Sequence, residues 1–298
     1  MKTTLTTRWH RWQFERAVRD IAHTPAIAPG AMPYTALSMV QHRDVLPYLL
    51  ALKSFARFLP PSEVVVVADP TLDANDRALM REHVPLLEFR EAAEFRHPGI
   101  PMGGCWERLS AISERVQRQA VVQLDADTVA LQRPADVADA LAAGVSFTLG
   151  TEDGQRIAST HEMAARARQQ TEDSDHIQGR CEALLDQLDP EQRWRYVRGC
   201  AGFAGFARGA FDREMLIEIS SRMRALIGDD WNRWGTEQFT SNLVVSSSPG
   251  GRVLPHPRYC APHRRTAETV FLHFIGYVRY TSSYYADVSR RVCTELRG

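Results

Sequence analysis

The sequence predicts an α/β fold with an open, mostly parallel sheet and helices on its faces. The chain has 298 residues, 44% hydrophobic and 24% charged, as in soluble globular proteins that bury a core. Short β-branched or apolar runs alternate with helix-forming stretches through the first half of the chain. The run 64–67, four valines without polar alternation, is typical of a strand buried on both faces. Strands that alternate with helices pair mostly in parallel.

Each element of this alternation follows from local signals. Leu46, Leu49, Leu50, Lys53 and Ala56 recur at helical spacing, and two prolines at 60 and 61 stop that helix. The predicted elements in chain order are a strand at 34–40, a helix at 43–58, a strand at 64–67, a helix at 73–82, a strand at 85–89, a helix at 106–117, and strands at 120–124 and 145–149.

The domain organisation predicted is a single large domain, 34–298, after an extension, 1–33. A polar, helix-prone insertion covers about 151–195, and its residues 171–175 read as an exposed loop. The extension contains Trp9, Arg11 and Trp12. We expect it to form a helix packed on the body of the protein, and a contact with a lipid surface or a partner stays open.

Composition excludes several classes of function. Lysine plus arginine equals aspartate plus glutamate at 36 each, so no overall charge favours binding to nucleic acid. Five scattered cysteines without paired spacing argue against a disulfide scaffold and a thiolate zinc site. No apolar run approaches the ~20 residues that span a bilayer, and no apolar signal core is present. We therefore expect a cytoplasmic protein without a transmembrane segment; the oligomeric state is not indicated.

The strongest chemical signal is Asp125-Ala126-Asp127, which directly follows the predicted buried strand 120–124. In open α/β sheets ligands bind at the carboxyl ends of the strands. Carboxylates this close raise each other's pKa unless they share a cation, and a divalent ion with phosphate ligands removes that penalty. A simple turn after the strand is the alternative. The D-x-D-x-T pattern of aspartate-nucleophile phosphatases does not fit, since Thr128 follows Asp127 at once.

Three motifs together resemble the GT-A fold glycosyltransferases, in particular the retaining group that includes glycogenin and bacterial lipopolysaccharide galactosyltransferases. The hydrophobic run into D-A-D-T matches 121–129. The H-F-x-G-x-x-K-P-W motif is matched by 273–280, with arginine for lysine and without Pro-Trp. An acidic-Gln pair followed by asparagine is matched by Glu237, Gln238 and Asn242. The resemblance implies a GT-A (Rossmann-like) single domain with a mixed, mostly parallel central sheet and flanking helices.

The resemblance also implies a metal and donor site. His273 becomes the third protein ligand beside Asp125 and Asp127, and the resulting O,O,N set suits Mn²⁺ (or Mg²⁺). Gly276 allows close approach of backbone to a diphosphate. Arg279 reaches the same diphosphate and neutralises the charge of the leaving group.

Further site residues are expected on weaker grounds. Topology alone places Ser38 and Gln41 near the base and ribose. The resemblance places Arg108 over the nucleotide and an acidic contact with the donor sugar at Glu152 and Asp153. The catalytic candidates on the reacting face of the sugar are Glu237 and Gln238.

The predicted function is a metal-dependent glycosyltransferase that transfers a hexose from a nucleotide-diphosphate sugar, a UDP-sugar by resemblance, to an acceptor hydroxyl with retention. The acceptor, a glycan or a small molecule, is not indicated. Two alternatives stay open: a sugar-1-phosphate nucleotidyltransferase, although 34–44 lacks the glycine-rich loop of those enzymes, and a non-catalytic nucleotide-sugar-binding protein.

Overall fold

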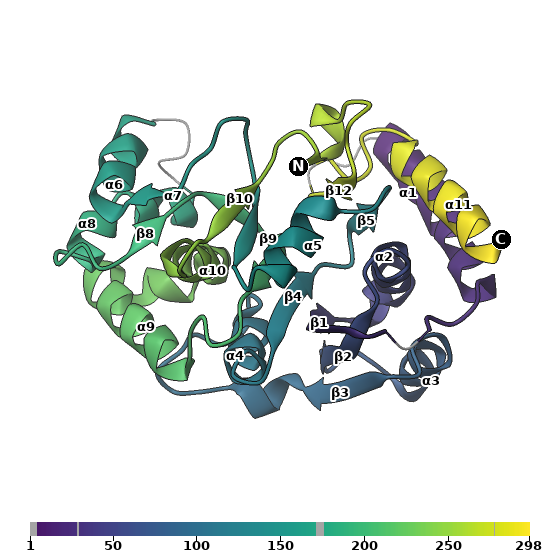
Figure 1. Cartoon of the computed structure of the whole chain (residues 1–298), viewed down its shortest axis with the longest axis horizontal. Coiled ribbons are helices and arrows are strands. Elements are labelled where there is room, and N and C mark those ends of the chain that lie inside the picture. The colour runs from purple at the N-terminus through teal and green to yellow at the C-terminus, as the bar shows by residue number, and fades with distance from the viewer. Residues whose placement is uncertain (1–4, 29, 171–175, 277) are drawn as a thin grey trace. The chain divides into compact units, whose positions relative to one another are not determined.

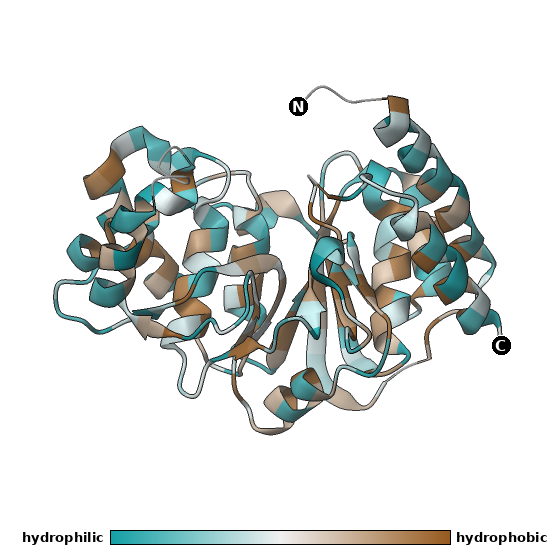
Figure 2. Ribbon diagram, turned by 90° about the horizontal axis from the view of Figure 1, so that it is seen from above, coloured by the Kyte–Doolittle hydropathy of each residue, from teal (hydrophilic) through white to brown (hydrophobic). Residues whose placement is uncertain are grey.

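The computed structural model describes residues 5–28, 30–170, 176–276 and 278–298, which form helices and strands of an α/β fold (Figure 1). They divide into two compact units. The first comprises Met1–Arg90, Leu124–Ala135 and His256–Gly298, and the second Glu91–Gln123 and Asp136–Pro255. The central sheet of seven strands is mainly parallel, which confirms the predicted fold class. Figure 2 shows that the hydrophobic residues gather on the strands and on the inner sides of the helices.

In the first unit, strands β1, β2 and β3 lie side by side in that order. They span Met32–Val40, Pro61–Ala68 and Leu87–Glu91. The parallel register of β1 and β2 pairs Val40 with Ala68, so both strands end at the same edge of the sheet. Two helices follow these strands, α2 at Val45–Ala56 and α3 at Ala74–His83.

A second, three-stranded sheet in the first unit has the order β11-β12-β5. Its strands are Tyr259–Cys260, Phe271–His273 and Thr128–Ala130. The antiparallel pairing of β12 with β5 joins segments that are more than a hundred residues apart in the chain. This pairing is what brings the two main sequence motifs together.

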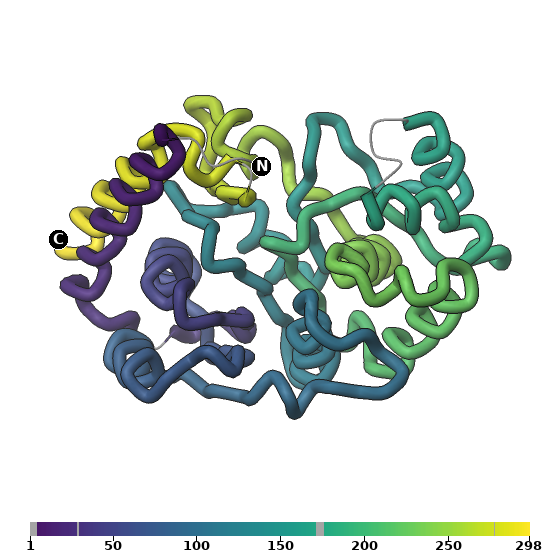
Figure 3. Tube along the Cα trace, turned by 180° about the vertical axis from the view of Figure 1, so that it is seen from behind, coloured from purple at the N-terminus to yellow at the C-terminus, as the bar shows by residue number. Residues whose placement is uncertain are grey.

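Two helices from opposite ends of the described chain run side by side in the first unit, as Figures 1 and 3 show. They are α1, Leu5–Val18, and α11, Tyr284–Arg297. Phe14 of α1 stacks on Tyr285 of α11 with ring centroids 3.9 Å apart, and Tyr285 stacks at the same separation on Phe274. The aromatic stack therefore holds α1 against the segment that follows His273, as expected for a helix packed on the body.

In the second unit the strand order is β10-β6-β9-β4. Strand β9 is antiparallel to β6, and β10 is parallel to it. These strands span Arg252–Leu254, Phe147–Gly150, Gly199–Phe206 and Ala120–Leu124. The longer helices are α4 at Trp106–Arg115, α5 at Ala135–Ala142, α9 at Arg213–Ile227 and α10 at Thr236–Ser247.

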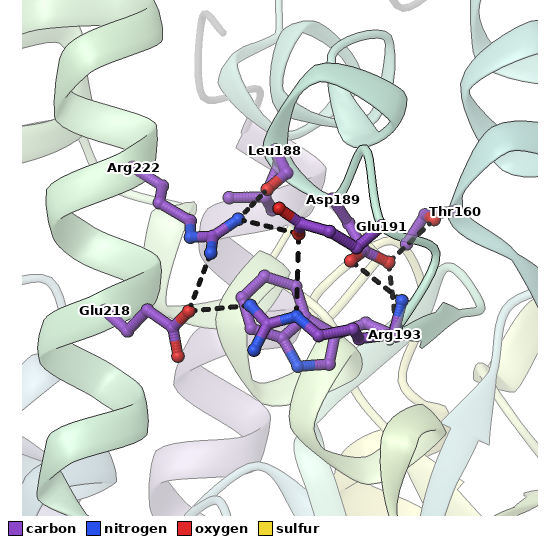
Figure 4. Close-up of polar contacts among 8 residues, drawn as sticks. Thr160, Leu188, Asp189, Glu191, Arg193, Glu218 and Arg222 are labelled. Carbon is purple, nitrogen blue, oxygen red and sulfur yellow. Dashed lines mark hydrogen bonds and ion pairs between the residues drawn. The ribbon is translucent and has the colours of Figure 1, made fainter.

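The polar stretch 151–195 forms short elements around a buried carboxylate. Asp189 is fully buried and accepts hydrogen bonds from Thr160 Oγ1 at 3.0 Å and from the backbone nitrogens of Arg193 and Trp194 at 2.9 and 2.8 Å (Figure 4). A buried acid is tolerated because these donors replace its lost water. The elements are β7 at Ala158–Ser159, α6 at Thr160–Gln169, α7 at Ile177–Glu182, α8 at Leu185–Leu188 and β8 at Arg195–Tyr196. The predicted loop 171–175 lies outside the described residues.

Two expectations drawn from composition can be compared with the structure. The five cysteines, all of them among the described residues, form no disulfide bond. Within the described part of the chain, no helix combines the length and the apolar composition that a membrane crossing requires.

Candidate functional site

The acidic pair lies in a tight turn between β4 and β5. The backbone nitrogen and the hydroxyl of Thr128 donate to the carbonyl oxygen of Asp125 at 3.2 and 2.7 Å, which closes the turn. This turn, rather than the alternation of side chains along a strand, sets the geometry of Asp125 and Asp127. Asp127 is 8% exposed, while Asp125 is half-buried.

His273 reaches the turn through the pairing of β12 with β5. That register sets His273 opposite Thr128, and the nitrogen of Phe274 donates to the carbonyl of Asp127 at 2.8 Å. The imidazole Nε2 lies 3.2 Å from Asp127 Oδ1. Asp125, Asp127 and His273 each offer one ligand atom, and these atoms lie within 4.8 Å of one another. The three residues form what we call the DDH cluster.

Arg279 completes the surroundings of Asp127. Its Nη2 forms an ion pair with Asp127 Oδ2, and its Nε donates to the carbonyl oxygen of Phe274 at 3.2 Å. Burial alone would raise the pKa of Asp127, but His273 and Arg279 outweigh it and lower that pKa to about 2. Burial alone would lower the pKa of Arg279, but the charge of Asp127 outweighs it and raises the pKa. Asp127 is therefore an ionised carboxylate at neutral pH.

The DDH cluster fits a divalent cation on the chemistry of its donors. Two carboxylates and one imidazole nitrogen supply an O,O,N set, which Mn²⁺ accepts readily and Mg²⁺ accepts when phosphate and water complete its shell. His273 Nε2 lies 3.2 Å from a carboxylate oxygen of Asp127, so both atoms are near enough to bind one cation. The alternative in which the acidic residues only form a turn does not account for this imidazole.

A cavity of about 720 Å³ lies in the same unit, with Arg279 in its wall. Ligand pockets fall in the range of roughly 300–1,000 Å³. The wall has a small excess of positive charge, because its charged side chains are four arginines, Arg11, Arg19, Arg43 and Arg279, and three acids, Glu15, Asp44 and Asp76, with His42 beside them. Gly276 also lines it, and a Cβ there would meet no atom within 4 Å. The cavity is suited to an anionic ligand that comes close to the backbone.

Ser38 and Gln41, expected near the nucleotide, have defined partners. Ser38 is buried, and its hydroxyl donates to the carbonyl oxygen of Leu124 at 2.5 Å, which fixes β1 against the end of β4. Gln41 Nε2 donates to Asp44 Oδ2 at 2.7 Å and so holds a residue of the cavity wall. Both side chains support the segments that carry the site.

The other candidates belong to the second unit. Arg108 of α4 and Glu237 of α10 are buried and form an ion pair, with Arg108 Nη2 3.2 Å from Glu237 Oε1. Gln238 is half-buried: its Oε1 accepts from the nitrogen of Ala201 at 3.3 Å, and its Nε2 donates to Gln178 at 2.7 Å. The structure therefore brings Arg108 and Glu237 together as a pair, and Gln238 directly follows Glu237 in the chain.

The expected acidic sugar contacts, Glu152 and Asp153, are exposed residues of the second unit. Glu152 pairs with Arg166 at 2.7 Å, and it lines a polar cavity of about 450 Å³. Asp153 accepts a hydrogen bond from the nitrogen of Gly154 at 2.9 Å.

Sequence reasoning missed two features of the first unit. The first is that α1, with Arg11 and Glu15 among its residues, forms a wall of the larger cavity, which Arg19 directly after this helix extends. The second is another group of two aspartates and a histidine, His42, Asp73 and Asp76, whose ligand atoms also lie within 4.8 Å of one another. Only the helix-start pattern at Asp73 gives any sequence signal for it.

The structure has the fold of known glycosyltransferases. A crystal structure of an active-site mutant of LgtC matches with a TM-score of 0.53 at 11% identity, covering 88% of this chain and 95% of LgtC. A complex of the galactosyltransferase LgtC with donor and acceptor sugar analogues matches with 0.47 at 12% identity, covering 89% and 96%. Mouse xyloside xylosyltransferase 1 matches with 0.47 at 13% identity, covering 82% and 98%. No protein-family model and no curated protein matches the chain. The predicted GT-A fold is confirmed by the first of these likenesses.

Proposed function

We propose that this protein is a metal-dependent glycosyltransferase that transfers a hexose from a UDP-sugar to an acceptor hydroxyl with retention. The observation that carries the proposal is the convergence of Asp125, Asp127 and His273 beside Arg279, which itself lines a basic cavity. The fold shared with LgtC supports the class of reaction.

The cavity is the proposed place of the nucleoside diphosphate. Its volume of about 720 Å³ is sufficient for a nucleotide, and its arginines match the charge of a diphosphate. Gly276 presents backbone without a side chain at this wall, so a phosphate can approach closely. Gln41, through Asp44, holds the segment that we propose to face the base and ribose.

The DDH cluster would hold Mn²⁺ or Mg²⁺, and the bound cation would supply Lewis acidity to the departing diphosphate. Arg279 then has two roles. It keeps Asp127 ionised and oriented, and its side chain, still 28% exposed, can donate to a diphosphate oxygen. A guanidinium stays protonated throughout, so it stabilises the charge that forms as the nucleotide leaves.

Glu237 and Gln238 are the proposed groups on the donor sugar. Of the two, we expect Gln238 to contact the sugar, because it is half-buried and its amide is held by Ala201 and Gln178, whereas Glu237 is buried. A glutamine is also the residue replaced in the active-site mutant of LgtC. Glu237, paired with Arg108, would act by orienting this region, and Glu152 and Asp153 remain proposed contacts of the sugar.

The test is a transfer assay with a panel of nucleotide sugars and acceptors, with and without Mn²⁺, run beside a thermal-shift screen of the same donors. We expect one donor to raise the melting temperature only with the ion, and to be hydrolysed or transferred. A ligand at a hundredfold excess over Kd adds about 2.7 kcal/mol to the stability of the folded state. Binding without turnover of any donor would identify a binding protein, and release of pyrophosphate from NTP and sugar-1-phosphate a nucleotidyltransferase.

A further inference from the structure

Helix α1 presents a hydrophobic stripe to solvent on the side away from its packed residues. Phe14, Ala17 and Val18 are buried, whereas Leu5 is 83%, Trp9 55% and Trp12 46% exposed. Five large hydrophobic side chains are exposed among the described residues, and three of them belong to this one helix. Such a concentration marks an interaction surface, because isolated exposed residues would be scattered over the molecule.

The spacing makes these residues one continuous surface. Leu5, Trp9 and Trp12 follow the i, i+4, i+7 pattern, so they lie along one face of the helix. The rings of Trp9 and Trp12 stack with centroids 4.8 Å apart. Arg8 and Arg16 fall on the same face at helical spacing, and the guanidinium of Arg16 lies 5.7 Å from the Trp12 ring centroid. We call these five residues the α1 stripe.

We propose that the α1 stripe binds the surface of an anionic phospholipid membrane. Tryptophan is favoured at the membrane–water interface, where its ring meets the acyl boundary and its N–H meets the headgroups. Arginines on the same face pair with lipid phosphates, and helices that combine the two lie in the plane of the interface. This proposal does not depend on the transferase activity.

Charge favours lipid over a second copy of this chain as the occupant. A symmetric contact places the same surface on both partners, so Arg8 and Arg16 of one copy would face arginines of the other. Glu15, the exposed acidic residue of α1, already forms an ion pair with Arg11 at 2.7 Å. An anionic bilayer supplies the negative charge that a second copy lacks.

The neighbouring helix shows that this composition is particular to α1. The exposed face of α11 carries Arg290 and Arg291, but these pair within the helix with Asp287 at 2.8 Å and Glu295 at 3.6 Å. No large hydrophobic side chain is exposed on the described residues of α11. Because α1 also contributes Arg11 and Glu15 to the cavity wall, a membrane at the α1 stripe would lie next to that cavity.

The experiment is flotation of the full chain with vesicles of phosphatidylcholine alone and of phosphatidylcholine with phosphatidylglycerol. We expect flotation with the anionic vesicles and none with the zwitterionic ones. Trp9→Ala/Trp12→Ala should lower the partition coefficient at least tenfold. Arg8→Glu/Arg16→Glu should lower it more than about 25-fold, since each basic residue near an anionic surface contributes roughly a factor of five.

Matched controls change the same residue types elsewhere. Trp234 is 70% exposed in the second unit, and Trp234→Ala should float like the wild type. Arg208→Glu/Arg252→Glu removes two exposed arginines of that unit and should have little effect. All variants are compared by melting temperature, so that a folding defect is recognised.

Three results would overturn the proposal. They are absence of flotation with anionic vesicles, loss of flotation equally in the control variants, and self-association that the tryptophan variant abolishes while vesicles have no effect. The last result would assign the α1 stripe to contact between copies.

Discussion

The first unit contains two groups of identical composition, the DDH cluster and the group of His42, Asp73 and Asp76. In each, one histidine and two aspartates offer ligand atoms within 4.8 Å of one another. In the DDH cluster, Asp127 and His273 are buried and Asp125 is half-buried. In the other group, only Asp76 is buried, and the side chain of His42 is 63% exposed.

The two groups differ in whether another structural role accounts for the positions of their residues. Asp73 and Asp76 form the capping box of α3: each carboxylate accepts from the other's backbone nitrogen, at 2.9 and 3.1 Å, and His42 then pairs with Asp76 at 2.7 Å. Helix capping therefore accounts for the positions of both aspartates in that group, and no bound cation is needed to account for them. The contacts described for Asp127 and His273 form no helix cap but bring three ligand atoms together, so the DDH cluster is where we expect a cation.

The largest expected effect is on turnover. Asp127→Ala should lower the rate at least about a thousandfold, because the loss of a metal ligand removes several kcal/mol of transition-state charge stabilisation. Asp73→Ala should leave the rate within a few-fold of wild type. The rates are measured with the donor found in the thermal-shift screen; similar losses in both variants would break the distinction between the two groups.

The second unit offers a contrast to the DDH cluster in the buried ion pair of Arg108 and Glu237. Glu237→Ala leaves Arg108, which is 3% exposed, without this partner and should destabilise the protein by about 3–5 kcal/mol. Chemical denaturation measures it. Gln238→Ala serves as the control: we expect a small loss of stability and a larger loss of kcat, and the reverse pattern would remove Gln238 from the proposed site.

An effect of intermediate size is expected on the affinity for Mn²⁺, which should depend on the DDH cluster and not on the capping group. His273→Gln should weaken Mn²⁺ binding by about 10- to 100-fold, since one of three protein ligands is lost. Asp73→Ala, in the capping group but not in the cavity wall, should leave the affinity unchanged. Calorimetric titration of Mn²⁺ in the presence of UDP gives both values, and a weaker affinity in the Asp73 variant would place the cation in the capping group.

The smallest expected effect concerns pH. A hydrogen bond to Asp76 raises the pKa of His42 above its ordinary value near 6.5. A raised folded-state pKa contributes stability that is present below the unfolded pKa and is lost as pH rises through the folded one. The melting temperature of wild type should therefore exceed that of His42→Gln more at pH 5.5 than at pH 8.5. An equal difference at both pH values would show that the pair carries no charge.

The sequence predicted the elements of the first half closely, because their signals are local. The helix expected at 43–58 is α2, Val45–Ala56, and the strand expected at 64–67 is β2, Pro61–Ala68. Valine runs, helical spacing and paired prolines act within a few residues, so they can be recognised without the rest of the fold. The acidic pair at the end of β4 is a signal of the same local kind.

The remaining features of the fold and the site depend on contacts between residues that are far apart in the sequence. Nothing local predicts that β12 pairs with β5 and carries His273 to Asp127; only resemblance to a family suggested it. The role of α1 as a cavity wall depends on the stack of Phe14 on Tyr285, which joins opposite ends of the described chain. The group around His42 was missed for the same reason, since one segment supplies the helix cap, Asp73 and Asp76, and a separate segment supplies its partner, His42.

The most direct measurement is the position of manganese in crystals grown with Mn²⁺ and UDP, located by its anomalous scattering. The account predicts the strongest peak within coordination distance of Asp125, Asp127 and His273 Nε2, with the diphosphate bound to the same ion and Arg279 in contact with it. A peak at His42, Asp73 and Asp76, with none at the DDH cluster, would contradict it.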